Sequence, residues 1–272
     1  MSYFTLANGM KLYYEDTGKG EQTVIMMHGW TSNHEIYSEP VQRLRNKARC
    51  TIYDHRGHGN SKDANGEPTM ETLASDLHEL ITGLSLSNIT LVGWSMGAGV
   101  VMNYVRQYGC EYLRQIVLCD MSPKQLNDKY WHLGLYKGRY TQKDVEKNQN
   151  ESFENLYQSF AIGAVPKLRK LPPFLLKPIL KKRISACDES VVTSLSASMK
   201  AQDNRDVIEQ ITVPVTYFYA STGTLFSSKL ADWYKRHVKT EFHAVPFPNS
   251  SHLIISENPE KFADEMEKVL SR

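Results

Sequence analysis

Residues 88–109 read NITLVGWSMGAGVVMNYVRQYG, an apolar strand pattern that passes directly into a helical pattern. At the join, the pentapeptide GWSMG places Ser95 between two glycines. In a G-x-S-x-G turn from strand to helix, glycines remove Cβ atoms that would collide with neighbouring backbone, and the serine oxygen stands clear of the sheet. The alternative is that the glycines only make a tight turn and that the serine has no chemical role.

Similar apolar strands alternate with helical patterns along the chain. Strand patterns occupy 23–29, 50–57, 88–95, 113–120, 213–220 and 240–247, and helical patterns occupy 39–48, 69–84, 96–109 and 257–270. Near the start, Asn8-Gly9 separates two β-rich segments and predicts a hairpin. Continuously apolar strands that alternate with helices predict an α/β fold with a mostly parallel, doubly wound sheet covered on both faces.

The alternation stops between residues 122 and 206, where we find helical patterns and no convincing strand pattern. An insertion after the carboxyl end of a strand lies over the sheet edge at which such folds bind ligands. We therefore expect a helical lid at 122–206, inserted into a core made of 1–121 and 207–272. In the lid, Trp131 and Tyr136 are candidate substrate-binding residues, as is Leu225 in the core, although aromatic residues at helical spacing also form cores.

One stretch of this expected lid is strongly basic. Residues 155–187 hold seven Lys and Arg residues and neither Asp nor Glu. The stretch is typical of a solvated face on lid helices, and it also fits attraction of anionic or amphipathic substrates or brief contact with a membrane interface. Prolines interrupt any long helix here, which argues against stable membrane insertion; they are Pro166, Pro172, Pro173 and Pro178.

Composition excludes several classes of protein. The chain has 272 residues, 41% of them hydrophobic, and a formal net charge of only +2, which predicts one sizeable core and no whole-protein field that attracts nucleic acid. No apolar run approaches the roughly 20 residues that span a bilayer, and the start lacks a signal pattern. The four cysteines have no metal-ligand spacing, so we expect reduced thiols, no metal and a cytoplasmic protein that acts on a small molecule.

Two other stretches supply what a reactive serine needs. A serine hydroxyl is a weak nucleophile and requires a base within hydrogen-bond reach, and His252 follows the last strand pattern on a loop at the appropriate sheet edge. His28-Gly29-Trp30 follows the first central strand. The backbone N–H groups of Trp30 and Met96 are therefore candidates to hold a developing oxyanion.

Four motifs together resemble the α/β-hydrolase superfamily in order and spacing. They are HGW at 28–30, DHRGHGNS at 54–61, GWSMGA at 93–98 and SSHLIISENPEKFADEM at 250–266. The HGW and SMGAG pair is similar to the aryl-esterase and cofactor-free haloperoxidase (perhydrolase) branch. The resemblance covers nearly the whole chain outside the expected lid. It implies Ser95 as nucleophile, His252 as base, and Trp30 and Met96 as oxyanion donors, with no metal or organic cofactor.

The acid of the expected triad departs from the family pattern. The family places an aspartate after the strand at 213–220, but this chain has Gly223 there and no carboxylate from 213 to 229. Neighbouring parallel strands lie about 4.8 Å apart, so Asp120, at the end of the preceding strand, is our candidate acid. Asp120 alternatively caps the following DMSP turn. In that case a Ser–His dyad, or an acid that we do not identify, would operate.

The sequence therefore predicts a serine hydrolase that cleaves a small carboxylic ester or related acyl substrate through an acyl-serine intermediate. A thioesterase, lactonase or carbon–carbon hydrolase would use the same residues on another substrate. Two other classes stay open: a cofactor-free oxygenase or lyase, and a weakly active binding or sensing protein. The glycine at position 223 is the reason for keeping the last of these.

Overall fold

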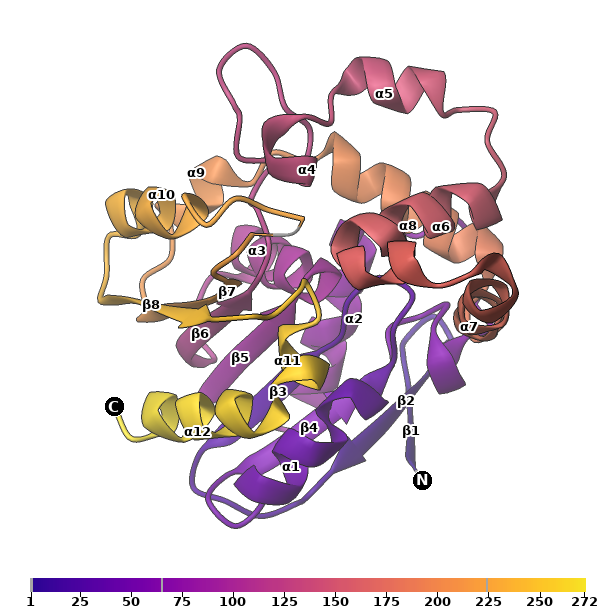
Figure 1. Cartoon of the computed structure of the whole chain (residues 1–272). Coiled ribbons are helices and arrows are strands. Elements are labelled where there is room, and N and C mark those ends of the chain that lie inside the picture. The colour runs from indigo at the N-terminus through magenta and orange to yellow at the C-terminus, as the bar shows by residue number, and fades with distance from the viewer. Residues whose placement is uncertain (1, 65, 224) are drawn as a thin grey trace.

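Figure 1 shows the computed structural model of the chain, which describes residues 2–64, 66–223 and 225–272. Its centre is an eight-stranded sheet with the order β1-β2-β4-β3-β5-β6-β7-β8. The strands are β1 (Ser2–Thr5), β2 (Lys11–Asp16), β3 (Thr23–Met27), β4 (Arg49–Tyr53), β5 (Ile89–Trp94), β6 (Leu113–Cys119), β7 (Val215–Ala220) and β8 (Phe242–Phe247). All neighbours from β4 to β8 are parallel, which confirms the mostly parallel sheet that the sequence predicts.

The first two strands form the expected hairpin. β1 pairs antiparallel with β2, so that Ser2 lies opposite Tyr14 and Thr5 lies opposite Lys11. The turn between them contains Gly9 at φ +83°, a backbone conformation that glycine adopts without a steric penalty. β2 then pairs antiparallel with β4, and the hairpin thus extends one edge of the parallel sheet.

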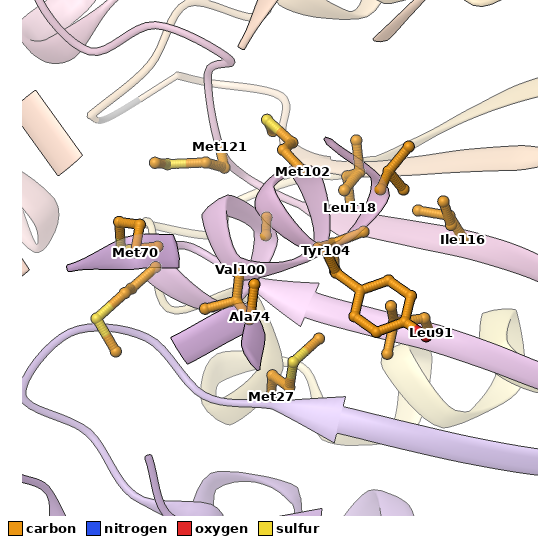
Figure 2. Close-up of a cluster of buried hydrophobic side chains, with 14 of the residues drawn as sticks. Met27, Met70, Ala74, Leu91, Val100, Met102, Tyr104, Ile116, Leu118 and Met121 are labelled. Carbon is orange, nitrogen blue, oxygen red and sulfur yellow. The ribbon is translucent and has the colours of Figure 1, made fainter. Parts of the chain in front are cut away.

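Helices cover both faces of the sheet, because successive residues of each central strand point to opposite sides. On one side, α2 (Met70–Gly83) and α3 (Met96–Tyr108) pack against strand residues such as Met27 and Leu91. Figure 2 shows this cluster, in which Val100 and Tyr104 of α3 lie over the strands. On the other side, α1 (Ser38–Leu44) and α12 (Pro259–Leu270) pack together over a second cluster that includes Met26. The sheet is therefore doubly wound, as predicted.

Between β6 and β7 the chain forms helices. They are α4 (Leu135–Gly138), α5 (Gln142–Lys147), α6 (Phe153–Ala164), the 3-10 turn η3 (Pro166–Lys170), α7 (Pro173–Ser185), α8 (Glu189–Ala201) and α9 (Arg205–Ile208). In this described stretch, β pairing is limited to isolated bridges such as that between Lys124 and Asp203. Figure 1 shows α4 to α8 gathered on one side of the sheet. The remaining short elements are η1 (His34–Tyr37), η2 (Gly59–Ser61), α10 (Leu230–His237) and α11 (Ile254–Glu257).

The basic stretch at 155–187 falls on α6, η3 and α7. Pro173 stands in the first turn of α7, where its missing N–H costs nothing. Pro178 was expected with the other three prolines to break any long helix here, but it lies inside α7 without ending it. Exposed apolar side chains accompany the basic ones, among them Phe174 and Ile179. Over the described residues, helices of the length and apolarity required to cross a bilayer are absent.

Candidate active site

Ser95 occupies a strained turn between β5 and α3. Its backbone has φ 53° and ψ −117°, a conformation that non-glycine residues adopt only where the surrounding structure imposes it. A Cβ on Gly93 would collide with the backbone of Gly97, and a Cβ on Gly97 would collide with the carbonyl of Met27. The Ser95 N–H donates to the carbonyl of Cys119 at 3.0 Å. Glycines and strand-end contacts together therefore fix the serine at the carboxyl edge of the sheet.

The structure brings Ser95, His252 and Asp120 together although they are far apart in the sequence. His252 Nε2 lies 2.9 Å from Ser95 Oγ, and His252 Nδ1 lies 2.6 Å from Asp120 Oδ2. A carboxylate only accepts hydrogen bonds, so Nδ1 carries the proton that is donated to Asp120 and Nε2 accepts from the Ser95 hydroxyl. The three residues are 8%, 2% and 2% exposed. This geometry is that of a nucleophile, a base and an orienting acid.

Asp120 reaches this position from the end of β6, where its φ is +44°. Its second oxygen, Oδ1, accepts a hydrogen bond from the N–H of Ala220 at 3.2 Å. The Asp120 N–H donates to the carbonyl of Phe218 at 2.7 Å. Both carboxylate oxygens thus have partners outside the DMSP turn. At the position that the family pattern gives to the acid, Gly223 adopts φ +56° and bonds back to the Ala220 carbonyl.

Several contacts hold the loop that carries His252. The indole N–H of Trp94 donates to the His252 carbonyl at 2.9 Å, and the His252 N–H donates to the carbonyl of Ala164 at 3.1 Å. One residue earlier, the Ser251 N–H donates to the carboxylate of Glu257. The sequence did not predict the contacts of Glu257 with Ser251 or of the Trp94 indole with the His252 carbonyl. A local motif does not indicate which backbone groups of a distant loop will lie next to it.

Two backbone N–H groups lie on segments next to the serine. Met96 is the first residue of α3, so its N–H has no acceptor within the helix. Trp30 follows Gly29, at which a Cβ would approach Ser95 Cβ to 3.0 Å; the HGW loop therefore lies against the serine turn. Among the hydrogen bonds of the described residues, none uses the N–H of Trp30 or Met96 as donor. Both N–H groups are therefore without an acceptor among the described residues.

A cavity opens from Ser95 beneath the helices that join β6 and β7. It measures about 660 Å³ with its opening to solvent included. Tyr136 and Leu225, two of the candidate substrate-binding residues, line it together with Trp30, Phe160 and Lys200. Phe160 is one of the lid aromatics that the sequence offered for either core or cavity wall, whereas Lys200 was missed, since it sits in an ordinary amphipathic helix with no local motif.

Trp131 is a correction to the predicted substrate wall. Its side chain is 3% exposed and packs edge-on against Trp233 with ring centroids 5.3 Å apart. Its indole N–H donates to the carbonyl of Lys124, and Arg205 lies over its ring. Trp131 therefore belongs to the packing between the inserted helices and α10, away from the cavity.

Tyr136 is held at the cavity by an unusual backbone. Tyr136 and Lys137 both adopt left-handed conformations, with φ 53° and 57°, and the Lys137 N–H donates to the carbonyl of Leu225 at 3.1 Å. The ring lies so close to Gly163 that a Cβ there would collide with it. Burial raises the pKa of Tyr136 to about 12, so the group presents a neutral phenol to the cavity.

Three other histidines lie buried behind the site, and they are unsuited to act as bases. Burial lowers the pKa of His55 to about 3 and that of His58 to about 4, and it lowers the pKa of His28 well below its ordinary value. His28 Nε2 accepts from the N–H of His55 at 3.0 Å, so the HG pair of the HGW loop has a structural contact of its own. The described part of the chain contains no cluster of three or more His, Cys, Asp or Glu side chains that could hold a metal ion.

The fold and these motifs define the class of protein. The family described as alpha/beta hydrolase fold matches residues 22–259, and the chain therefore belongs to the α/β-hydrolase family, which confirms the resemblance carried by its motifs. Among solved structures, the esterase EaEST from Exiguobacterium antarcticum superposes with a TM-score of 0.84 at 22% identity, covering 100% of this chain and 99% of that one.

Two sequence relatives add to this comparison. The chain is 34% identical to the non-heme chloroperoxidase CPO-A1 of Kitasatospora aureofaciens over 124 residues, 45% of either chain; this match spans less than half of that relative. It is 25% identical to the pimeloyl-[acyl-carrier protein] methyl ester esterase of Vibrio cholerae over 266 residues, 97% of this chain and 99% of the other.

Proposed function

We propose that this protein is an esterase that cleaves a carboxylic ester through an acyl-serine intermediate. The observation that carries the proposal is the continuous hydrogen-bonded series from Asp120 through His252 to Ser95, at 2.6 and 2.9 Å. The family membership and the relatives named as esterases support the same class of reaction. In this proposal Asp120, directly after β6, takes the place of the acid that the family carries after β7.

The proposed reaction follows from these contacts. Ser95 Oγ attacks the ester carbonyl while His252 Nε2 takes its proton, and the Asp120 carboxylate stabilises the imidazolium. The N–H groups of Trp30 and Met96 hold the oxyanion, each contributing about 3 kcal/mol to the stabilisation of the transition state. His252 then gives its proton to the leaving alcohol. A water molecule, deprotonated by the same nitrogen, attacks the acyl-enzyme and releases the acid.

The helices between β6 and β7 complete the proposed site. We assign residues 122–206 the role of a lid, because α6 and α8 supply cavity residues and touch the serine side of the core. The carbonyl of Val192 accepts a hydrogen bond from the Trp30 indole at 2.7 Å, and the carbonyl of Ala164 accepts from the N–H of His252. The lid is thus hydrogen-bonded directly to the HGW loop at 28–30 and to the loop that carries His252.

Labelling with a fluorophosphonate probe tests the nucleophile. We expect covalent labelling of the folded protein, one adduct per chain, which disappears in Ser95→Ala and persists in Ser75→Ala, where a half-buried serine of α2 is changed. Mass spectrometry of the labelled peptide locates the adduct. A folded protein that is not labelled, or that is labelled equally in Ser95→Ala, would exclude the acyl-serine mechanism and favour an oxygenase or a sensing protein.

The chloroperoxidase relative suggests a second activity of the same site. Hydrogen peroxide in place of water would attack the acyl-enzyme and release a peracid, with His252 again taking the proton. Peracid formation from an ester and peroxide, measured for the wild type and for Ser95→Ala, distinguishes this side reaction from one that does not use the serine. A peracid yield that does not depend on Ser95 would contradict the assignment.

A further inference from the structure

Lys200 lines both the active-site cavity and a second hollow beside it. The cavity at Ser95 adjoins a second hollow that lies nearer the surface, and the two share Trp30, Tyr140, Asn148, Leu156, Ser196 and Lys200. Lys200, near the end of α8, therefore stands where the two hollows meet. Among the described residues that line either hollow, it is the only one with a charged side chain.

Among the described residues, no carboxylate forms an ion pair with Lys200. Burial lowers its pKa, and desolvation is the sole cause of that shift, with no carboxylate acting on it. The nearby acids of the chain have other partners. Glu71 accepts from the amide of Gln202 at 2.8 Å, and Asp203 pairs with Arg205 at 2.6 Å. A cation that is partly removed from water without a partner destabilises the structure, and a bound anion would offset that cost.

The surroundings of Lys200 fit one end of an extended substrate. Trp30, Tyr140 and Leu156 provide apolar and aromatic surface beside it, and Asn148 offers a neutral hydrogen-bonding group. Ser95 and Lys200 both line the inner cavity. A chain that places its ester carbonyl at the serine can thus extend along apolar walls and end at the ammonium group.

We propose that the natural substrate is an ester whose acyl part ends in a carboxylate, and that Lys200 Nζ binds this carboxylate while the ester carbonyl lies at Ser95. A lone ammonium balances one negative charge. A phosphate dianion would require a second cation, and neither hollow has one among its described residues. The inference rests on the proposed esterase reaction and names the substrate class of that reaction.

Two matched substrates test the proposal. One is the para-nitrophenyl half-ester of adipic acid, which ends in a carboxylate, and the other is its neutral analogue in which an isopropyl group replaces the carboxylate. We expect the wild type to have a kcat/KM at least about 10-fold higher for the anionic ester, because a hydrogen bond to a charged group contributes about 1.5–3 kcal/mol. Adipate itself should inhibit competitively. Both measurements need no variant.

Variants then assign the preference to one side chain. In Lys200→Met we expect kcat/KM for the anionic ester to fall about 10- to 100-fold, mainly through KM, with the neutral ester changed less than about 3-fold. Lys200→Arg should retain part of the preference. Lys181→Met removes the same charge from an exposed position on α7 and should leave both substrates unchanged.

The possible outcomes separate the inference from the esterase proposal. A wild type that hydrolyses the neutral ester without preferring the anionic one would overturn the role of Lys200 and leave the esterase standing. The same conclusion follows if Lys200→Met lowers both substrates equally or if Lys181→Met has the same effect as Lys200→Met. Hydrolysis of neither ester, together with absent fluorophosphonate labelling, would overturn both proposals.

Discussion

Replacing Asp120 with asparagine changes one atom of the proposed triad and tests the acid that departs from the family pattern. In the structure, one carboxylate oxygen accepts from His252 Nδ1 and the other accepts from the N–H of Ala220. An asparagine amide has one acceptor oxygen and one donor nitrogen. If its nitrogen faces His252, the histidine is held as the tautomer whose Nε2 carries a proton, and Nε2 is then unable to accept from Ser95. If its oxygen faces His252, two donors meet at Ala220.

The size of the effect follows from these two orientations. The productive orientation leaves the Ala220 N–H without an acceptor, which costs about 1–3 kcal/mol. The imidazolium in the transition state also loses a charged partner, and a hydrogen bond to a charged group contributes about 1 to 2 kcal/mol more than one to a neutral group. The sum is about 2–5 kcal/mol, a fall in kcat of roughly 30- to 5,000-fold.

Steady-state hydrolysis of a nitrophenyl ester measures this change, with thermal unfolding to verify that Asp120→Asn is folded. The control is Asp264→Asn, which removes an exposed carboxylate that pairs with Arg43 and should leave kcat unchanged. A folded Asp120→Asn variant that retains kcat within about 3-fold of the wild type would refute the reasoning and favour a Ser–His dyad.

Two further predictions concern stability. Asp76→Ala should destabilise the fold by about 3–5 kcal/mol in urea denaturation, because it leaves the guanidinium of Arg56 buried without its partner; a loss below about 1 kcal/mol would contradict this. At His34, burial lowers the pKa, but the hydrogen bond and charge of Asp54 raise it above 6.5 overall. A histidine whose pKa is raised in the folded state stabilises the fold at any pH below its unfolded-state pKa. This stabilisation is lost as the pH rises through the folded-state pKa. The difference in unfolding free energy between wild type and His34→Gln should therefore shrink from about pH 6 to about pH 9. A difference that stays constant or grows over this range would exclude the ion pair.

The pattern of the chain was sufficient to predict the sheet and most of its helices. Strands buried on both faces read as continuous apolar runs, as in TVIMM of β3, and helices of the two covering layers begin at local signals such as Thr69, which caps α2. Predicted boundaries differ from the observed ones by a few residues at strand ends, where polar residues such as Asp54 and His55 follow the last paired residue. These features are local in the chain, and so a single sequence reveals them.

The cavity was predicted only in part. Tyr136 and Leu225 line it, whereas Trp131 packs against Trp233 and Lys200 was not considered. In the inserted helices, aromatic residues serve both as packing between helices and as cavity wall. Whether a given aromatic residue packs between helices or lines the cavity depends on how each helix is rotated about its axis relative to its neighbours. The sequence pattern alone does not contain that rotation.

By itself, the sequence determined the strand-to-helix turn at Ser95, because Gly93 and Gly97 lack the Cβ atoms that would collide with neighbouring backbone in so sharp a turn. Only the tertiary structure decided that His252 and Asp120 meet this serine, since residues separated by 132 and 157 positions come together through the order of the strands. The physical reason is that local sterics act between neighbours in the chain, whereas a triad requires parallel strands to end at one edge. The absence of an aspartate at position 223 was visible from the beginning, and the adjacency of β6 and β7 explains how a carboxylate from the neighbouring strand reaches the same histidine.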